Sequence, residues 1–315
     1  MKLHKHVTDY IAFKQALGGR FQTEARTLKA FSRAMGDVDI TEVEPTSVQA
    51  FIAGKGAVTS FWHQKFGVLS RFYRFLMIRN YIDSSPLPKT VPKCPEPMKP
   101  YIYTPQDLRK LLAATNRLQS PWSPLRACTF HTLILTLYGT GLRIGEALSL
   151  TLADVNFPES LIMVRNGKFF KTRLVPTGPR LTDTLLAYVQ RRRKLPCPQG
   201  EASAFFVTRS GNALTYDQAR KVFPILRNLA AIHREKEARY QPRVHDIRHT
   251  MAVHRLLSWY REGADVQRLL PQLSTYLGHR DIAATQRYLT IIPELRNQAS
   301  RRFEHYAMQE VENEN

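Results

Sequence analysis

A segment dense in proline divides this chain and limits the folds that it can adopt. Residues 83–100, which include PLPKTVPKCPEPMKP, have prolines at 86, 88, 92, 95, 97 and 100. Proline fixes φ and lacks a backbone N–H, so neither a helix nor a central strand is expected to cross this stretch. We therefore predict a helical domain over 1–82, a semi-extended linker over 83–100, a second domain over 101–292 and a tail helix over 293–315.

The composition points to a polyanionic partner. The chain has 46 Lys and Arg against 26 Asp and Glu, a formal net charge of +20. Double-stranded DNA is the natural candidate, because neutralised phosphates release counterions. The basic residues are spread along the chain and mixed with aromatic residues, which disfavours a membrane anchor. No run reaches signal-peptide or transmembrane length, and Cys94, Cys128 and Cys197 lack metal-site spacing. We expect a cytoplasmic protein without metal or cofactor.

Two helices of the first domain carry basic stripes. In a helix predicted over 23–35, apolar residues recur at i, i+3 and i+7 on one face and basic residues recur with the same spacing on the opposite face. A second helix is predicted over 58–82. The candidate DNA-contacting residues are Arg26, Lys29 and Arg33 on the first helix, and Lys65, Arg71 and Arg74 on the second. Either stripe alone is equally compatible with a solvated face, but two of them in a chain of this charge favour DNA.

The second domain is predicted to be mostly helical with one small antiparallel sheet. Thr104 and Pro105 suit the N-cap and first position of a helix. Around Asn166-Gly167, a pair typical of tight hairpins, two β-rich runs extend over about 161–165 and 172–175. The expected fold class is therefore mainly α with a small antiparallel β-sheet, in two domains.

Four short motifs in this domain carry candidate chemistry. In YGTGLRIGEAL, Arg143 follows a glycine turn and lies one turn before Glu146. Lys168 follows the Asn-Gly of the hairpin, and in HDIRHT His245 and Arg248 are three residues apart. In the fourth motif, LGHRD, His279 precedes Tyr288 by nine residues. Each motif alone has a structural explanation, such as an i, i+3 ion pair or a half-buried tyrosine. Together they supply what phosphoryl transfer without a metal needs: guanidiniums to hold phosphate oxygens, an oxygen nucleophile, and groups that move protons.

This set, in this order, closely resembles the tyrosine recombinases of the lambda-integrase class over residues 101–300. The resemblance implies a clamp around duplex DNA, made by a SAM-like core-binding domain and a catalytic domain. It implies that Tyr288 attacks the scissile phosphate to form a 3′-phosphotyrosyl bond and that Lys168 protonates the 5′-oxygen. Arg143, Arg248 and His279 would bind phosphate oxygens, His245 would serve as acid/base near the tyrosine, and Glu146 would orient Arg143.

Several alternatives stay open at this point. Phe169 and Phe170 depart from the small or polar residues usual after the hairpin lysine, so Lys171 competes with Lys168 as general acid. A type IB topoisomerase-like enzyme would use nearly the same residues, and a DNA-binding regulator that has lost catalysis is a third possibility. The resemblance also implies a tetramer on specific recombination sites, with accessory DNA-bending proteins as further partners. The tail over 293–315 docks either on a neighbouring protomer or on its own catalytic domain.

Overall fold

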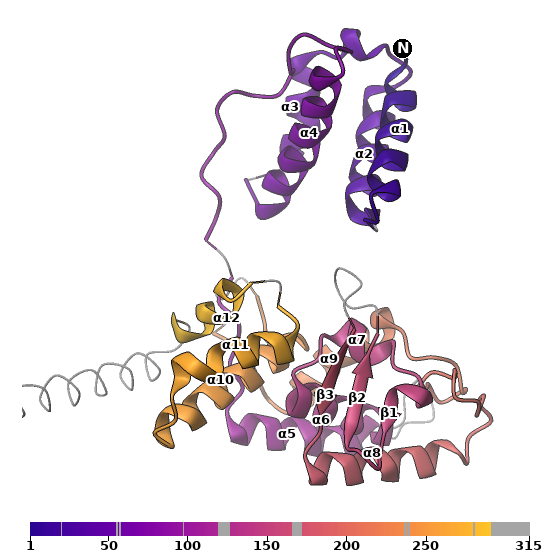
Figure 1. Cartoon of the computed structure of the whole chain (residues 1–315), viewed down its shortest axis with the longest axis vertical. Helices are drawn as coiled ribbons and strands as arrows, with labels where there is room; N and C mark the ends of the chain where they lie inside the picture. The colour runs from indigo at the N-terminus through magenta and orange to yellow at the C-terminus, as the bar shows by residue number, and fades with distance from the viewer. Residues whose placement is uncertain are drawn as a thin grey trace, which may run out of the picture. The chain divides into compact units, whose positions relative to one another are not determined.

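The chain divides into two compact units, Met1–Met98 and Lys99–Asn315 (Figure 1). The structure is a computed structural model of the whole chain. It describes residues 1–19, 21–54, 56, 58–96, 98–118, 127–165, 172–235, 238, 240–279 and 281–290.

The first unit is a small helical bundle. Its helices are α1 (Leu3–Ala16), α2 (Gln22–Met35), α3 (Pro45–Ala53) and α4 (Ser60–Ile78). The predicted apolar face of α2 is confirmed, because Leu28 and Phe31 are fully buried. Helix α4 is shorter than the predicted range. It begins where the Thr59 hydroxyl accepts a hydrogen bond from the backbone N–H of Trp62, and it ends before Asn80, whose φ of 56° is left-handed.

The proline-rich stretch contains no regular secondary structure in its described residues. Residues 83–96 and 98–100 are neither helix nor strand. This agrees with the loss of backbone donors that so many prolines impose.

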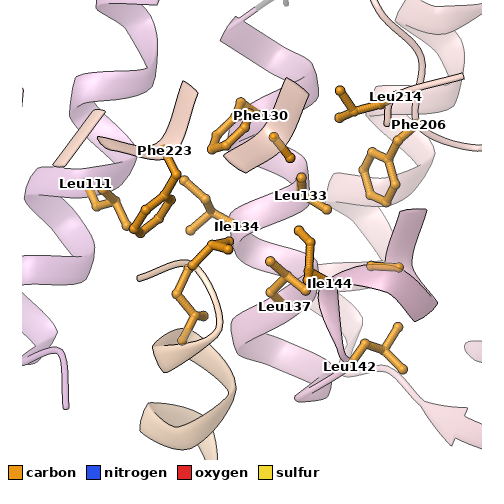
Figure 2. Close-up of a cluster of buried hydrophobic side chains, with 14 of the residues drawn as sticks. Leu111, Phe130, Leu133, Ile134, Leu137, Leu142, Ile144, Phe206, Leu214 and Phe223 are labelled. Carbon is orange, nitrogen blue, oxygen red and sulfur yellow. The ribbon is translucent and has the colours of Figure 1, made fainter. Parts of the chain in front are cut away.

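The second unit packs its helices around a buried central helix. Its helices are α5 (Pro105–Thr115), α6 (Ala127–Thr140), α7 (Ile144–Leu148), α8 (Pro179–Arg192), α9 (Tyr216–Leu229), α10 (Asp246–Arg261), α11 (Val266–Leu277), α12 (Ala283–Gln286) and the 3₁₀ turn η5 (Arg287–Thr290). Helix α6 has no Lys, Arg, Asp or Glu, and Figure 2 shows its Phe130 and Ile134 beside Leu111 of α5 and Phe223 of α9. Thr104 caps α5 as predicted, accepting from the Asp107 backbone N–H at 3.0 Å.

The predicted hairpin is confirmed in its strands. Strands β2 (Leu161–Val164) and β3 (Arg173–Pro176) pair antiparallel, with Ile162 opposite Val175. A third strand, β1 (Val155–Asn156), pairs with β2 and was not predicted, since two residues show no alternation. The turn residues 166–171 lie outside the described residues.

A second apolar cluster holds the end of the described chain. Met251, Leu256, Leu273 and Leu277 of α10 and α11 are buried together with Tyr288 of η5. The last helices, drawn in orange and yellow in Figure 1, therefore share a core of their own. Within the described part of the chain, every helix falls short of the length and apolar character needed to cross a membrane.

Candidate active site

Three arginines meet at the C-terminal end of helix α11. Arg173 Nε donates to the Tyr276 carbonyl at 3.0 Å, Arg248 Nη2 donates to the Leu277 carbonyl at 2.7 Å, and Arg143 Nη2 donates to the Gly278 carbonyl at 3.1 Å. The last carbonyls of a helix lack intrahelical partners and carry partial negative charge. These carbonyls therefore offset the mutual repulsion of three guanidiniums and fix where each arginine points.

The carboxylate of Glu146 holds two of these arginines. Its oxygens accept from Arg143 Nη1 at 2.8 Å, from the Arg143 backbone N–H at 2.9 Å, and from Arg173 Nη2 at 2.8 Å. Burial raises the pKa of Glu146, but hydrogen bonds and charge from Arg173 and Arg143 outweigh burial and lower the pKa to about 2. Glu146 is therefore an anion that anchors Arg143, the N-cap residue of α7.

Two glycines beside these arginines have a left-handed backbone. Gly278 ends α11 with a φ of +66°, and a Cβ there would lie 2.7 Å from Arg173 Nη1. Gly141, before Arg143, has a φ of +61°, and a Cβ there would lie 2.3 Å from the Met251 Cε. Both positions need glycine for the left-handed backbone and for the missing side chain.

Arg248 is almost fully buried. Its side chain is 3% exposed, and Nη1 donates to the Gly141 carbonyl at 2.6 Å. Burial and the nearby charge of Arg143 lower the pKa of Arg248 to about 10, so the guanidinium stays charged at neutral pH. Since both ends of this guanidinium are held by backbone carbonyls, its charge is fixed in place close enough to act on Tyr288.

Tyr288 lies among histidines and arginines. Its hydroxyl oxygen is 3.2 Å from His249 Nδ1, and its ring stacks on that of His279 with centroids 6.0 Å apart. Burial raises the pKa of Tyr288, while charge and hydrogen bonding from Arg248 and charge from Arg143 act in the opposite direction. The phenol is 3% exposed. Two arginines thus favour a negative charge on this oxygen, although burial opposes it.

The three histidines have distinct partners. His279 Nδ1 pairs with the buried hydroxyl of Thr285 at 2.7 Å, which orients the ring. His245 is the N-cap residue of α10, one turn before His249, and its ring meets that of His249 edge-on at 4.9 Å. Burial lowers the pKa of all three, and Arg248 adds to this lowering, so each is neutral at neutral pH.

The structure thus brings together five of the predicted residues, Arg143, Glu146, Arg248, His279 and Tyr288. His245 lies next to them, in ring contact with His249. Both candidate lysines, Lys168 and Lys171, lie outside the described residues. Sequence reasoning missed two residues of the site, Arg173 and His249. A signal for His249 was available, because it follows Arg248 directly and lies one helical turn after His245. Arg173 gave no local signal, since its partners are distant in sequence.

The candidate DNA-contacting residues lie on the first unit. Five of the six are exposed along α2 and α4: Arg26, Lys29, Arg33, Arg71 and Arg74. Lys65 is half-buried, and its ammonium donates to the Phe51 carbonyl at 2.6 Å and lies over the Phe51 ring. Lys65 therefore caps the end of α3 in this structure. In the described ranges, no three His, Cys, Asp or Glu side chains gather as a metal site.

Comparison with known proteins identifies the family. Residues 102–294 match the Phage integrase family. The chain is 33% identical over 301 residues to the putative integrase/recombinase y4rB of Sinorhizobium fredii, covering 95% of this chain and 96% of that protein. The chain belongs to the phage integrase family. The tyrosine recombinase XerD of Brucella abortus is also similar to this chain, with 30% identity over 82% of this chain and 81% of XerD.

Solved structures of similar fold agree with this family. The Tn1549 transposon integrase in complex with transposon right end DNA superposes with a TM-score of 0.72 at 17% identity, covering 98% of this chain and 100% of that one. A lambda integrase dimer bound to a COC′ core site gives 0.64 at 16% identity, covering 90% and 96%. The chain is a tyrosine recombinase, an enzyme of site-specific DNA recombination. The topoisomerase-like and regulator interpretations are not favoured.

Proposed function

We propose that the chain cleaves and rejoins duplex DNA at specific sites through a covalent 3′-phosphotyrosyl bond to Tyr288. The observation that carries this proposal is the surroundings of the phenol oxygen, which faces the Arg248 guanidinium and the His249 imidazole beside His279. An oxygen nucleophile, a proton acceptor and fixed positive charge therefore converge on one atom. Transesterification at phosphorus needs this combination.

Arg143 and Arg248 hold the non-bridging oxygens of the scissile phosphate in this proposal. Each guanidinium carries several N–H donors, and the contacts to Glu146 and to the backbone carbonyls use part of them. The carbonyls and Glu146 fix the two groups before DNA arrives, so little reorganisation is needed when charge develops at phosphorus. His279, oriented by Thr285, adds a further donor.

The leaving 5′-oxygen takes its proton from Lys168 in this proposal, and Lys171 is the alternative. Because the phosphodiester energy is kept in the phosphotyrosyl bond, rejoining needs no ATP. The phenol is buried, so Tyr288 has to become accessible to the phosphate before attack, with its contact to His249 kept.

The first unit serves as the core-binding half of a clamp around DNA in this proposal. Support comes from its four-helix composition and from the exposed basic residues along α2 and α4, Arg26, Lys29, Arg33, Arg71 and Arg74. The proline-rich stretch would let the two halves close around a duplex. We extend the proposal to a SAM-like fold for this unit, as the resemblance implies.

The recombining assembly is a tetramer on two DNA sites in this proposal, assisted by DNA-bending proteins. Its support is the sequence of the tail, where apolar residues recur at helical spacing over 295–306. A short helix with one apolar stripe needs a surface that buries the stripe. We assign that surface to the neighbouring protomer.

The test is covalent trapping on a suicide duplex with a nick beside the cleavage point. The duplex carries a sequence selected from a randomised pool by binding to the full chain. Tyr288→Phe removes only the nucleophilic oxygen, so we expect no covalent adduct and unchanged DNA affinity. Tyr276→Phe is the matched control, since its hydroxyl bonds the Pro176 carbonyl at 3.2 Å. An adduct in Tyr288→Phe, or its loss in Tyr276→Phe alone, contradicts the assignment.

A further inference from the structure

The hydrogen-bond partner of the Tyr288 hydroxyl is His249, a residue to which the resemblance gives no role. His249 Nδ1 lies 3.2 Å from the phenol oxygen, and the two ring centroids are 5.6 Å apart. His249 belongs to the first turns of α10, a well-packed helix whose Met251 and Ala252 are buried. The imidazole is thus presented to the phenol by a rigid element.

The neighbours of the phenol oxygen decide which way its proton points. The guanidinium of Arg248 carries only donors, so it cannot take the phenol proton, and its positive charge favours an ionised phenol oxygen. His249 Nδ1, 3.2 Å from that oxygen, can take the proton when the ring hydrogen is on Nε2.

The charges that face His249 keep its imidazole neutral at rest. His245, Arg248 and Arg243 surround it from its own helix and the residues just before that helix, Asp246 opposes them, and His279 and Tyr288 face it from the segment after α11. Burial, followed by the neighbouring positive groups, lowers the pKa of His249 to about 4. A scissile phosphate bound to Arg143 and Arg248 brings negative charge into this field, so His249 becomes a better proton acceptor when the substrate arrives.

We propose that His249 is a further catalytic residue, which accepts the Tyr288 proton during attack and returns it during rejoining. This role rests on the proposed function and replaces the one that the resemblance gave to His245. In the forward step the Tyr288 O–P bond forms and the bond from phosphorus to the 5′-oxygen breaks. The tyrosine proton moves to His249 Nδ1, and the 5′-oxygen leaves with its electron pair and takes a proton from the hairpin lysine. His245 contacts His249 edge-on, with ring centroids 4.9 Å apart, and takes no proton in this step.

The experiment measures the rate of covalent adduct formation on the nicked suicide duplex selected by the full chain. His249→Ala should slow this rate by about 10²–10⁴ with DNA affinity unchanged. His249→Asn places an amide oxygen near the position of Nδ1 but takes up no proton, so it should stay at least about tenfold slow. In both variants the rate should rise with pH, because the phenol then loses its proton to hydroxide, whereas a structural defect gives no such slope.

His254→Ala is the matched control, because His254 Nδ1 makes the same kind of contact, 2.9 Å from the Tyr138 hydroxyl, on the same helix. Wild-type rates in both His249 variants overturn the proposal, as does a slow His245→Ala beside a normal His249→Ala. Full activity in His249→Asn alone means that His249 only positions the hydroxyl, which also overturns the proton transfer. If His249→Ala unfolds at a lower temperature than the wild type, the adduct rate of His249→Asn decides the test.

A second measurement separates this proposal from the proposed function. If the wild-type chain forms no adduct on the selected duplex, the proposed function fails and the catalytic role fails with it. The hydrogen-bond geometry is then tested alone, by nitrogen NMR of the full chain with labelled histidine at neutral pH. An unprotonated Nδ1 on His249, assigned by its loss in His249→Asn, supports the geometry, and a protonated Nδ1 overturns it.

Discussion

Replacing Glu146 with glutamine tests the charge network beneath the candidate active site. Glutamine keeps the shape of the side chain but removes its charge and turns an N–H₂ donor toward the guanidiniums of Arg143 and Arg173. These two groups then face each other without the carboxylate that holds them. We expect both lower stability of the second unit and slower DNA cleavage, because Arg143 loses its fixed position.

The size of the stability loss follows from the pKa of Glu146. Its pKa falls from 4.5 to about 2, and one pKa unit corresponds to about 1.4 kcal/mol, so the ionised carboxylate contributes roughly 3 kcal/mol at neutral pH. Removal of one partner from a buried ion pair costs about 3–5 kcal/mol. Arg143 is 29% exposed and regains water, which favours the lower end, about 3 kcal/mol.

The pH dependence has a definite sign. A carboxylate whose pKa is lowered by folding stabilises the protein above its unfolded pKa and loses that effect as pH falls through the folded pKa. The difference between wild type and Glu146→Gln should therefore be constant between about pH 6 and 8 and shrink below about 4.5.

Urea-dependent hydrogen exchange, read by mass spectrometry, measures the two units separately. Peptides of α7 and β3 should report a free energy of unfolding about 3 kcal/mol lower in Glu146→Gln, and peptides of α2 should be unchanged. Glu159→Gln is the matched control, an exposed carboxylate bonded to Asn156 Nδ2 at 2.9 Å, and should change little. A loss below about 1 kcal/mol in Glu146→Gln would refute the reasoning.

Two further predictions concern groups whose roles rest on the sequence. A 5′-thiol leaving group needs no proton, so it should restore cleavage to Lys168→Ala, which is otherwise slowed by about 10²–10⁴; rescue of Lys171→Ala instead reverses the choice of lysine. Arg26→Ala and Arg33→Ala should each reduce, by about one, the steepness with which the logarithm of the DNA association constant falls with the logarithm of salt concentration. Lys5→Ala, at an exposed position of α1, serves as control. Unchanged DNA affinity and salt slope in both arginine variants would mean that the basic residues of α2 face solvent and do not contact DNA.

The sequence alone determined the local structure and most of the reacting groups. The apolar spacing of α2, the Thr104 cap and the two strands of the hairpin were all predicted, because each depends on residues within a few positions of one another. The motif spacing likewise pointed to Arg143, Arg248, His279 and Tyr288. Side chains that do chemistry stand out in a sequence when their type and order are unusual.

Only the tertiary structure decided how these groups meet. Arg143 reaches the Gly278 carbonyl across 135 positions, Arg173 reaches Glu146 across 27, and His249 reaches Tyr288 across 39. Such contacts depend on how α7, β3 and α10 pack against the end of α11, and no local pattern records that packing. In the sequence, Arg173 therefore looked like any other basic residue. The histidine that contacts Tyr288 is His249, one helical turn after His245, the histidine that the motif indicated. Periodicity fixes which face of a helix is buried, but only packing chooses which distant residue that face meets.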